Sequence, residues 1–126
     1  TTEEVEINIC SVDNSIVMEN NPTVMENIVI SPENLNAVKE GMKNVVDEGS
    51  AHAIFAGYPI KIGGKTGTAQ LGRNVSNNAF FIAFAPFDNP EIAICVAIEH
   101  GVRGANAAYV ARDLFDYYFG LTTVTQ

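Results

Sequence analysis

The chain has 126 residues, 47% of them hydrophobic, which is the size of one domain with enough apolar content to bury a core. Fifteen acidic residues against seven basic ones give a net charge of −8, which argues against binding nucleic acid or an anionic membrane surface. Two histidines, His52 and His100, stand far apart without neighbouring cysteine or carboxylate spacing, so we expect no metal site and no cofactor.

The two cysteines, Cys10 and Cys95, are too few for a disulfide framework. Cys95 lies in an apolar run, where a free thiol behaves as a small buried hydrophobe. Cys10 has no such context, and whether the two residues pair stays open at this point.

Residues 1–30 contain two short β-prone runs, at 5–12 and 15–18, and Asp13 with Asn14 forms the predicted turn between them. The pattern predicts a small β hairpin region. The chain opens at Thr1 without an initiator methionine, an apolar signal segment or a stretch long enough to span a membrane. We therefore expect a piece cut from a longer protein, and we treat the piece as a single unit.

A helix is predicted over residues 31–49. Ser31 suits the N-cap, Pro32 suits the first helical position, and Gly49 supplies the C-terminal stop. The helical spacing predicts one apolar stripe along its length, formed by Leu35, Val38, Met42, Val45 and Val46.

The run GKTGTAQ at residues 64–70 is the most informative stretch of the chain. Lys65 offers a compact cation, Thr66 and Thr68 offer hydroxyl donors, and Gly67 removes a side chain where another backbone must come close. A peptide-like ligand could pair its amides with the strand edge and its terminal carboxylate with the Lys/Thr cluster. Three letters are weak evidence, because the same run can be a glycine-rich turn that leads into a strand.

A strand-turn-strand hairpin follows, with an apolar run at 77–86, a turn at 87–90 and a second run at 91–99. In the second run the large residues Ile92, Ile94, Val96 and Ile98 alternate with the small residues Ala93, Cys95 and Ala97. Both faces are apolar, so we expect a helix to approach the small side and the sheet to be covered on both faces.

The last predicted helix covers residues 105–119, with Ala107, Ala111, Leu114 and Tyr118 at helical spacing and Gly120 as its stop. The fold class is therefore α+β, of the α/β sandwich type. An antiparallel sheet within residues 59–99 is flanked by the helices at 31–49 and 105–119.

Four blocks in this order resemble the C-terminal portion of a penicillin-binding protein transpeptidase domain, of the class B, monofunctional kind. They are VKEGMKNVVDEG at 38–49, GKTGTAQ at 64–70, AFFIAFAP at 79–86 and IEHG at 98–101. The alanine-rich last helix adds to the resemblance, which covers residues 31 to about 120. The implied fold is that of penicillin-binding proteins and serine β-lactamases.

The family also uses a Ser-x-x-Lys nucleophile and then a Ser-x-Asn motif, both upstream of Lys-Thr-Gly. No serine of this chain has a lysine three residues later, so the nucleophile motif is absent from it. Residues 76–78 read Ser-x-Asn but follow the triplet, in a predicted loop between strands, and we interpret them as a coincidence.

The resemblance implies a peptidoglycan D,D-transpeptidase that cross-links D-Ala-D-Ala stem peptides and binds β-lactams on the extracytoplasmic face of a bacterial membrane. It assigns catalytic roles to Lys65 and to the backbone N–H of Thr68, and substrate binding to Thr66, Gly67 and Thr68. The implied partners are the stem peptide, β-lactams and the missing N-terminal part of the domain. Without a nucleophile, this chain alone is predicted to be inactive, and its cut sheet could self-associate.

Two alternatives stay open from the sequence. One is a piece of a serine β-lactamase or of a β-lactam sensor domain, since both share the triplet. The other is a non-enzymatic α/β binding module in which the triplet is only a turn.

Overall fold

The computed structural model describes residues 6–9, 16–20 and 29–121, and its contacts divide the chain into two compact units, Thr1–Ile30 and Ser31–Gln126. The sequence alone predicts one unit. In the first, β1 (Glu6–Ile9) and β2 (Ile16–Asn20) pair antiparallel within the region predicted as a hairpin. The predicted turn at residues 13–14 and Cys10 lie outside the described residues.

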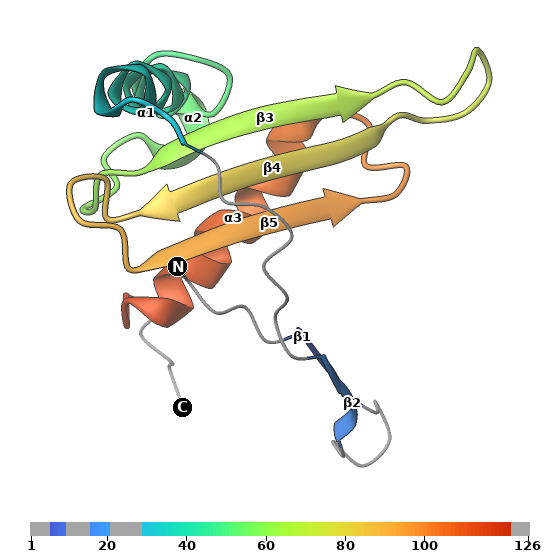
Figure 1. The fold of residues 1–126 in the computed structure, drawn as a ribbon. Helices are drawn as coiled ribbons and strands as arrows, with labels where there is room; N and C mark the ends of the chain where they lie inside the picture. The colour runs from blue at the N-terminus through green and yellow to red at the C-terminus, as the bar shows by residue number, and fades with distance from the viewer. Residues whose placement is uncertain (1–5, 10–15, 21–28, 122–126) are drawn as a thin grey trace. The chain divides into compact units, whose positions relative to one another are not determined.

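The second unit is an antiparallel meander with helices against it, so the predicted α+β class is confirmed (Figure 1). Strands lie in the order β3-β4-β5; α3 crosses one face of the sheet, α1 packs against β3, and α2 contacts α1 and α3. Among the described helices, none has the length and hydropathy needed to cross a bilayer. The elements are α1 (Pro32–Asp47), α2 (His52–Phe55), β3 (Gly63–Ala69), β4 (Asn78–Ala85), β5 (Ile92–Ile98) and α3 (Gly104–Tyr118).

Helix α1 begins as its sequence predicts. The Ser31 hydroxyl accepts a hydrogen bond from the backbone N–H of Asn34 at 3.3 Å, and a proline stands in the first turn. The predicted apolar stripe is wrong in its first half, where Leu35 and Val38 are exposed, while Val46 near the C-terminal end is buried. In the described part of the chain nothing covers the first turns of α1, so only its last turns contribute to the core.

The core lies between α3 and one face of the sheet. On this face β4 presents Ala79, Phe81, Ala83 and Ala85, all buried, opposite the large residues of β5. Helix α3 meets them with its own small residues and one aromatic ring. These are Ala107, Ala108, Ala111 and Phe115, each 0% exposed. The small side chains on both sides let helix and sheet approach closely.

Two expectations about this packing are wrong. Helix α3 lies on the side of β5 that carries isoleucine and valine, because β4 supplies the small residues there. The opposite face of β4 and β5 is open among the described residues: Ile82 is 46% exposed, and Ala93, Cys95 and Ala97 are exposed. Cys95 is thus a surface thiol and not a buried one.

The buried stripe of α3 agrees with the prediction at Ala107 and Ala111 and departs from it in the last turns of the helix. Phe115 is buried, four residues after Ala111, whereas Leu114 is 45% exposed and Tyr118 is 49% exposed. The helix ends near Gly120, as predicted, and the positive φ of 66° at this glycine suits a C-terminal stop.

Tyr58, in the segment between α2 and β3, ties that segment to α3. Its hydroxyl donates to Asp116 Oδ1 at 2.7 Å, and the Arg112 guanidinium lies 5.6 Å from the centre of its ring. Arg112 also donates to the carbonyl oxygen of Ile54 at 2.5 Å. Burial, followed by the hydrogen bond to the Asp116 carboxylate, raises the pKa of Tyr58 above its usual value of 10.0.

The raised pKa predicts a loss of stability at high pH. Because the pKa of Tyr58 is higher in the folded state, its contribution is complete below the unfolded value of 10.0 and declines as the pH rises beyond it. We expect the stability advantage over Tyr58→Phe, measured by urea unfolding, to be smaller at about pH 11 than at about pH 8. Tyr109→Phe, at an exposed tyrosine, is the matched control. A pH-independent difference for Tyr58→Phe would contradict this account.

Candidate active site

The Lys-Thr-Gly triplet lies in β3, whose only partner among the described strands is β4. The turn interpretation of this run is therefore wrong. The register places Thr66 opposite Phe81 and Thr68 opposite Ala79. Side chains alternate along a strand, so Thr66 and Thr68 share the face of the core, while Lys65 and Gly67 share the open face. All four predicted site residues lie on this edge strand, with the two threonine side chains on one face of the sheet and the Lys65 side chain on the other.

Two glycines at the start of β3 make room for aromatic rings of β4. A Cβ at Gly64 would lie 2.6 Å from the ring of Phe81, and a Cβ at Gly63 would lie 2.5 Å from the ring of Phe84. Any larger residue would push these rings away from the strand. The glycines that looked like a turn in the sequence thus seat β3 against its neighbour.

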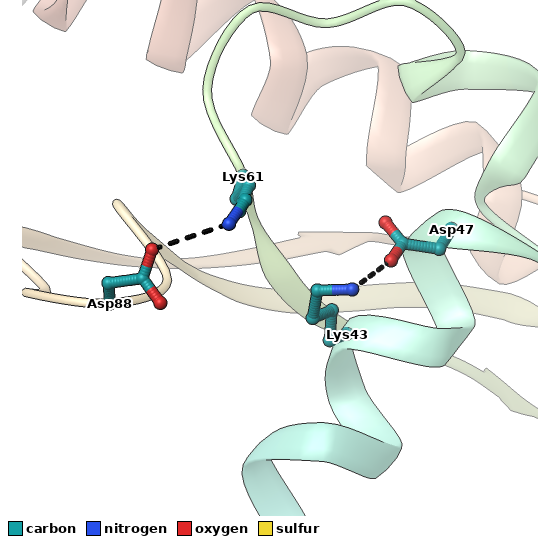
Figure 2. A network of polar contacts seen from close by, with 4 residues as sticks. All are labelled: Lys43, Asp47, Lys61 and Asp88. Carbon is teal, nitrogen blue, oxygen red and sulfur yellow. Dashed lines mark hydrogen bonds and ion pairs between the residues drawn. The ribbon is translucent and has the colours of Figure 1, made fainter.

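The Lys65 ammonium forms no ion pair with a carboxylate among the described residues. Its Nζ donates to the backbone carbonyl oxygen of Thr66 at 2.7 Å, and its side chain is exposed. By contrast, Lys43 pairs with Asp47, and Lys61 pairs with Asp88 at 3.6 Å (Figure 2). An ammonium group without a carboxylate partner, at the edge of an acidic chain, is suited to hold the carboxylate of a ligand.

The hydroxyl of Thr68 meets the start of α3. The backbone N–H of Gly104 donates to Thr68 Oγ1 at 3.0 Å. A hydroxyl that accepts in this way still has its own proton to donate. Thr68 is exposed, so this proton can be directed to an anionic ligand at the strand edge.

Gly104, the first residue of α3, packs against the backbone of β3. An alanine at this position should displace the helix from the strand. A Cβ would lie 2.5 Å from the carbonyl oxygen of Gly67 and 3.0 Å from that of Phe80. We expect Gly104→Ala to lower the free energy of unfolding by about 1–3 kcal/mol, as overpacking does. Gly41→Ala is the control, because nothing lies within 4 Å of its added methyl in α1 and it should gain about 0.5–1 kcal/mol. Equal unfolding curves for the two variants would contradict the contact.

Thr66 has a partner that sequence reasoning missed. Its Oγ1 lies 2.7 Å from the Oγ of Ser50, in the connection between α1 and α2. The two residues are sixteen positions apart, so no local pattern joins them. Only the packing of the end of α1 against β3 brings the hydroxyls together.

The turn between β5 and α3 holds the start of α3 in place with a left-handed backbone. His100 has a φ of 55° and Val102 a φ of 72°, and the latter is unfavourable for a β-branched residue. The residues that read Ser-x-Asn hold this turn: the Asn78 side chain accepts from His100 N–H at 3.0 Å, and the Asn77 carbonyl accepts from Val102 N–H at 2.9 Å. In the described structure the hydrogen bonds of Asn77 and Asn78 therefore stabilise the turn that precedes α3.

A family model described as the penicillin binding protein transpeptidase domain matches residues 4–116. The chain belongs to this family, and the resemblance drawn from the sequence is confirmed. The peptidoglycan D,D-transpeptidase MrdA of Haemophilus influenzae is 36% identical over 99 residues, which are 65% of this chain and 15% of that protein. Penicillin-binding protein 2B of Streptococcus pneumoniae is 32% identical over 114 residues, 82% of this chain and 16% of that protein.

The fold agrees with a solved relative. The crystal structure of PBP2 of Pseudomonas aeruginosa in complex with WCK 5153 superposes with a TM-score of 0.69 at 37% identity, covering 79% of this chain and 22% of that chain. The chain thus spans about 15% of the length of the curated relatives it matches. The family match spans residues 4–116 and therefore includes β3, the strand that carries the triplet.

Proposed function

We propose that this chain forms the Lys-Thr-Gly wall of a serine-type peptidoglycan D,D-transpeptidase site, and that the nucleophile comes from a part of the protein outside this chain. The observation that carries the proposal is the arrangement of β3: Lys65, Thr66 and Thr68 line a strand edge, and the Lys65 ammonium has no described carboxylate partner. The serine would attack the carbonyl of a D-Ala-D-Ala stem and release the last D-alanine. It would then pass the acyl group to an amine of a neighbouring peptide.

Each residue of the triplet has a role in this proposal. Lys65 attracts the terminal carboxylate of the substrate and supports the hydrogen bonds that link the substrate to the family's upstream Ser-x-Asn motif, which would come from the part of the protein outside this chain. Thr66 and Thr68 hold the carboxylate through their hydroxyls, and Gly67 lets the acyl chain come close to the strand. The backbone N–H of Thr68 supplies half of the oxyanion hole, and the N–H of the attacking serine supplies the other half.

β-Lactams would acylate the same serine, because they imitate the stem peptide. The name of the pneumococcal relative, penicillin-binding protein 2B, supports this part of the proposal. The reaction would take place on the extracytoplasmic face of a bacterial membrane, with the anchor on a part of the protein outside this chain.

The open face of the sheet is where the rest of the transpeptidase domain would pack. It carries exposed apolar side chains on β4 and β5, including Ile82. In the longer protein this face would be buried, whereas the chain alone would tend to self-associate through it. Sedimentation of the chain alone should reveal concentration-dependent association, and a clean monomer at high concentration would contradict this part of the proposal.

Intact-mass spectrometry after incubation with excess benzylpenicillin tests the central claim. We expect no adduct on this chain alone. We expect one stoichiometric adduct when the chain is joined to the sequence that precedes it in its reading frame, at the serine of a Ser-x-x-Lys motif. A single adduct on the chain alone would overturn the placement of the nucleophile. Absence of any adduct on the longer protein would overturn the proposed function.

A further inference from the structure

Ser50 stands on a backbone that is fixed on both sides. A Cβ at Gly49 would lie 2.8 Å from Cα of Val45, so the chain leaves α1 pressed against its last turn. Ala51 is 0% exposed, and its N–H donates to the Val45 carbonyl at 3.1 Å. The N–H of His52 donates to the Gly49 carbonyl, also at 3.1 Å. The Ser50 backbone is therefore held in one place relative to α1.

The end of α1 is packed in turn against β3. A Cβ at Gly64 would lie 3.3 Å from Cγ2 of Val46, and Phe81, opposite Thr66 in the register, is 0% exposed. Gly64 and Thr66 project on the same face of the strand. The contact that seats α1 therefore also brings the Ser50 hydroxyl to Thr66.

The hydrogen-bonding capacity of the hydroxyls determines which of their protons remain free for a ligand. A hydroxyl has one proton to donate and can accept two hydrogen bonds. Thr68 accepts from the N–H of Gly104, which leaves its own proton for a ligand. Ser50 and Thr66 share one hydrogen bond of 2.7 Å, and either oxygen can be the donor. If Ser50 donates, the Thr66 proton is free as well, and acceptance of one bond strengthens the bond that a hydroxyl donates.

We propose that Ser50 is a positioning residue for the carboxylate of the ligand. Its hydroxyl donates a hydrogen bond to Thr66 Oγ1, as the Gly104 N–H donates to Thr68 Oγ1. Both threonines then accept from the protein and direct their own protons to the same anion. The inference rests on the proposed function and assigns to its site a residue outside the triplet. The ligand class is a peptide or peptide mimic with a terminal carboxylate.

Acylation kinetics of the full-length protein that carries the chain test the role. Benzylpenicillin is the probe, and stopped-flow measurements separate the dissociation constant of the non-covalent complex from the acylation rate constant. We expect Ser50→Ala to raise the dissociation constant about fivefold, the usual effect of one lost hydrogen bond, with little change in the rate constant. Ser50→Thr keeps a hydroxyl and should restore tight binding. Ser76→Ala, at an exposed loop serine, should match the wild type.

A double-mutant comparison with Thr66→Val distinguishes a positioning role of Ser50 from a general effect of its substitution on the fold. In Thr66→Val the hydroxyl that Ser50 would serve is gone, so adding Ser50→Ala should change the dissociation constant no further. Additive effects of the two substitutions would overturn the inference, as would a wild-type dissociation constant for Ser50→Ala. A full-length protein that benzylpenicillin does not acylate would overturn the proposed function and the inference with it. If benzylpenicillin acylates the full-length protein normally but Ser50→Ala does not change the dissociation constant, the inference is overturned and the proposed function stands.

Discussion

Lys65→Ala is expected to slow acylation of the full-length protein by benzylpenicillin about 10²-fold, the range seen when one preorganised donor is lost from an active site. The reason is electrostatic. The Lys65 ammonium bonds only a backbone carbonyl among the described residues, so its charge is available to the ligand carboxylate. The acylation rate at limiting benzylpenicillin, followed by intact mass over time, measures the effect.

Lys61→Ala is the matched control for this experiment. Lys61 lies just before β3, four residues ahead of Lys65, and is exposed like it, but it pairs with Asp88 (Figure 2). Exposed ion pairs contribute about 0–1 kcal/mol, so Lys61→Ala should leave both stability and acylation close to those of the wild type. If both lysine variants slowed acylation equally, the effect would come from net charge, and the role given to Lys65 would be wrong.

Phe81→Ala is expected to destabilise the chain by about 3–5 kcal/mol, the usual cost of removing a fully buried aromatic ring. Phe81 is 0% exposed, stacks on Phe55 at 6.0 Å between ring centres, and covers Gly64 of β3. Urea unfolding of the 126-residue chain measures the loss. A variant that loses less than about 1 kcal/mol would show that the ring does not fill the core as described.

Ile82→Ala, at the next residue of β4, provides the comparison. Its side chain projects from the open face and is 46% exposed, so its truncation should cost the chain alone about 1 kcal/mol or less. The same substitution should weaken self-association of the chain, because it removes apolar surface from the open face. A large loss of stability in Ile82→Ala would contradict the assignment of the two faces.

Features set by neighbouring residues could be predicted from the sequence. Ser31 caps α1 and Gly120 follows α3, because capping depends on a few adjacent dihedral angles and donors. The hairpin of β4 and β5 follows from two β-prone runs around a turn. The triplet is readable for a similar reason, since all of its chemistry lies on consecutive residues of one strand.

Features set by packing could not be predicted. The large and small sides of β5 are both apolar, and the alternation does not say which one a helix covers; the alanines of β4 decide that. In α3, Leu114 and Phe115 fit the helical spacing equally well, and only the position of the sheet selects Phe115. Ser50 escaped notice for the same reason, since its contact with Thr66 joins two segments that no local pattern relates.

The pairing of β3 with β4 has a consequence for errors in folding. If β3 slipped by one residue along β4, every side chain of β3 would change faces. Lys65 would then enter the apolar core, where an unpaired ammonium is costly, and both threonines would leave the neighbourhood of Ser50 and Gly104. The rings of Phe81 and Phe84, which fit only over Gly64 and Gly63, oppose such a slip. The two rings therefore also hold β3 in the alignment on which the site depends.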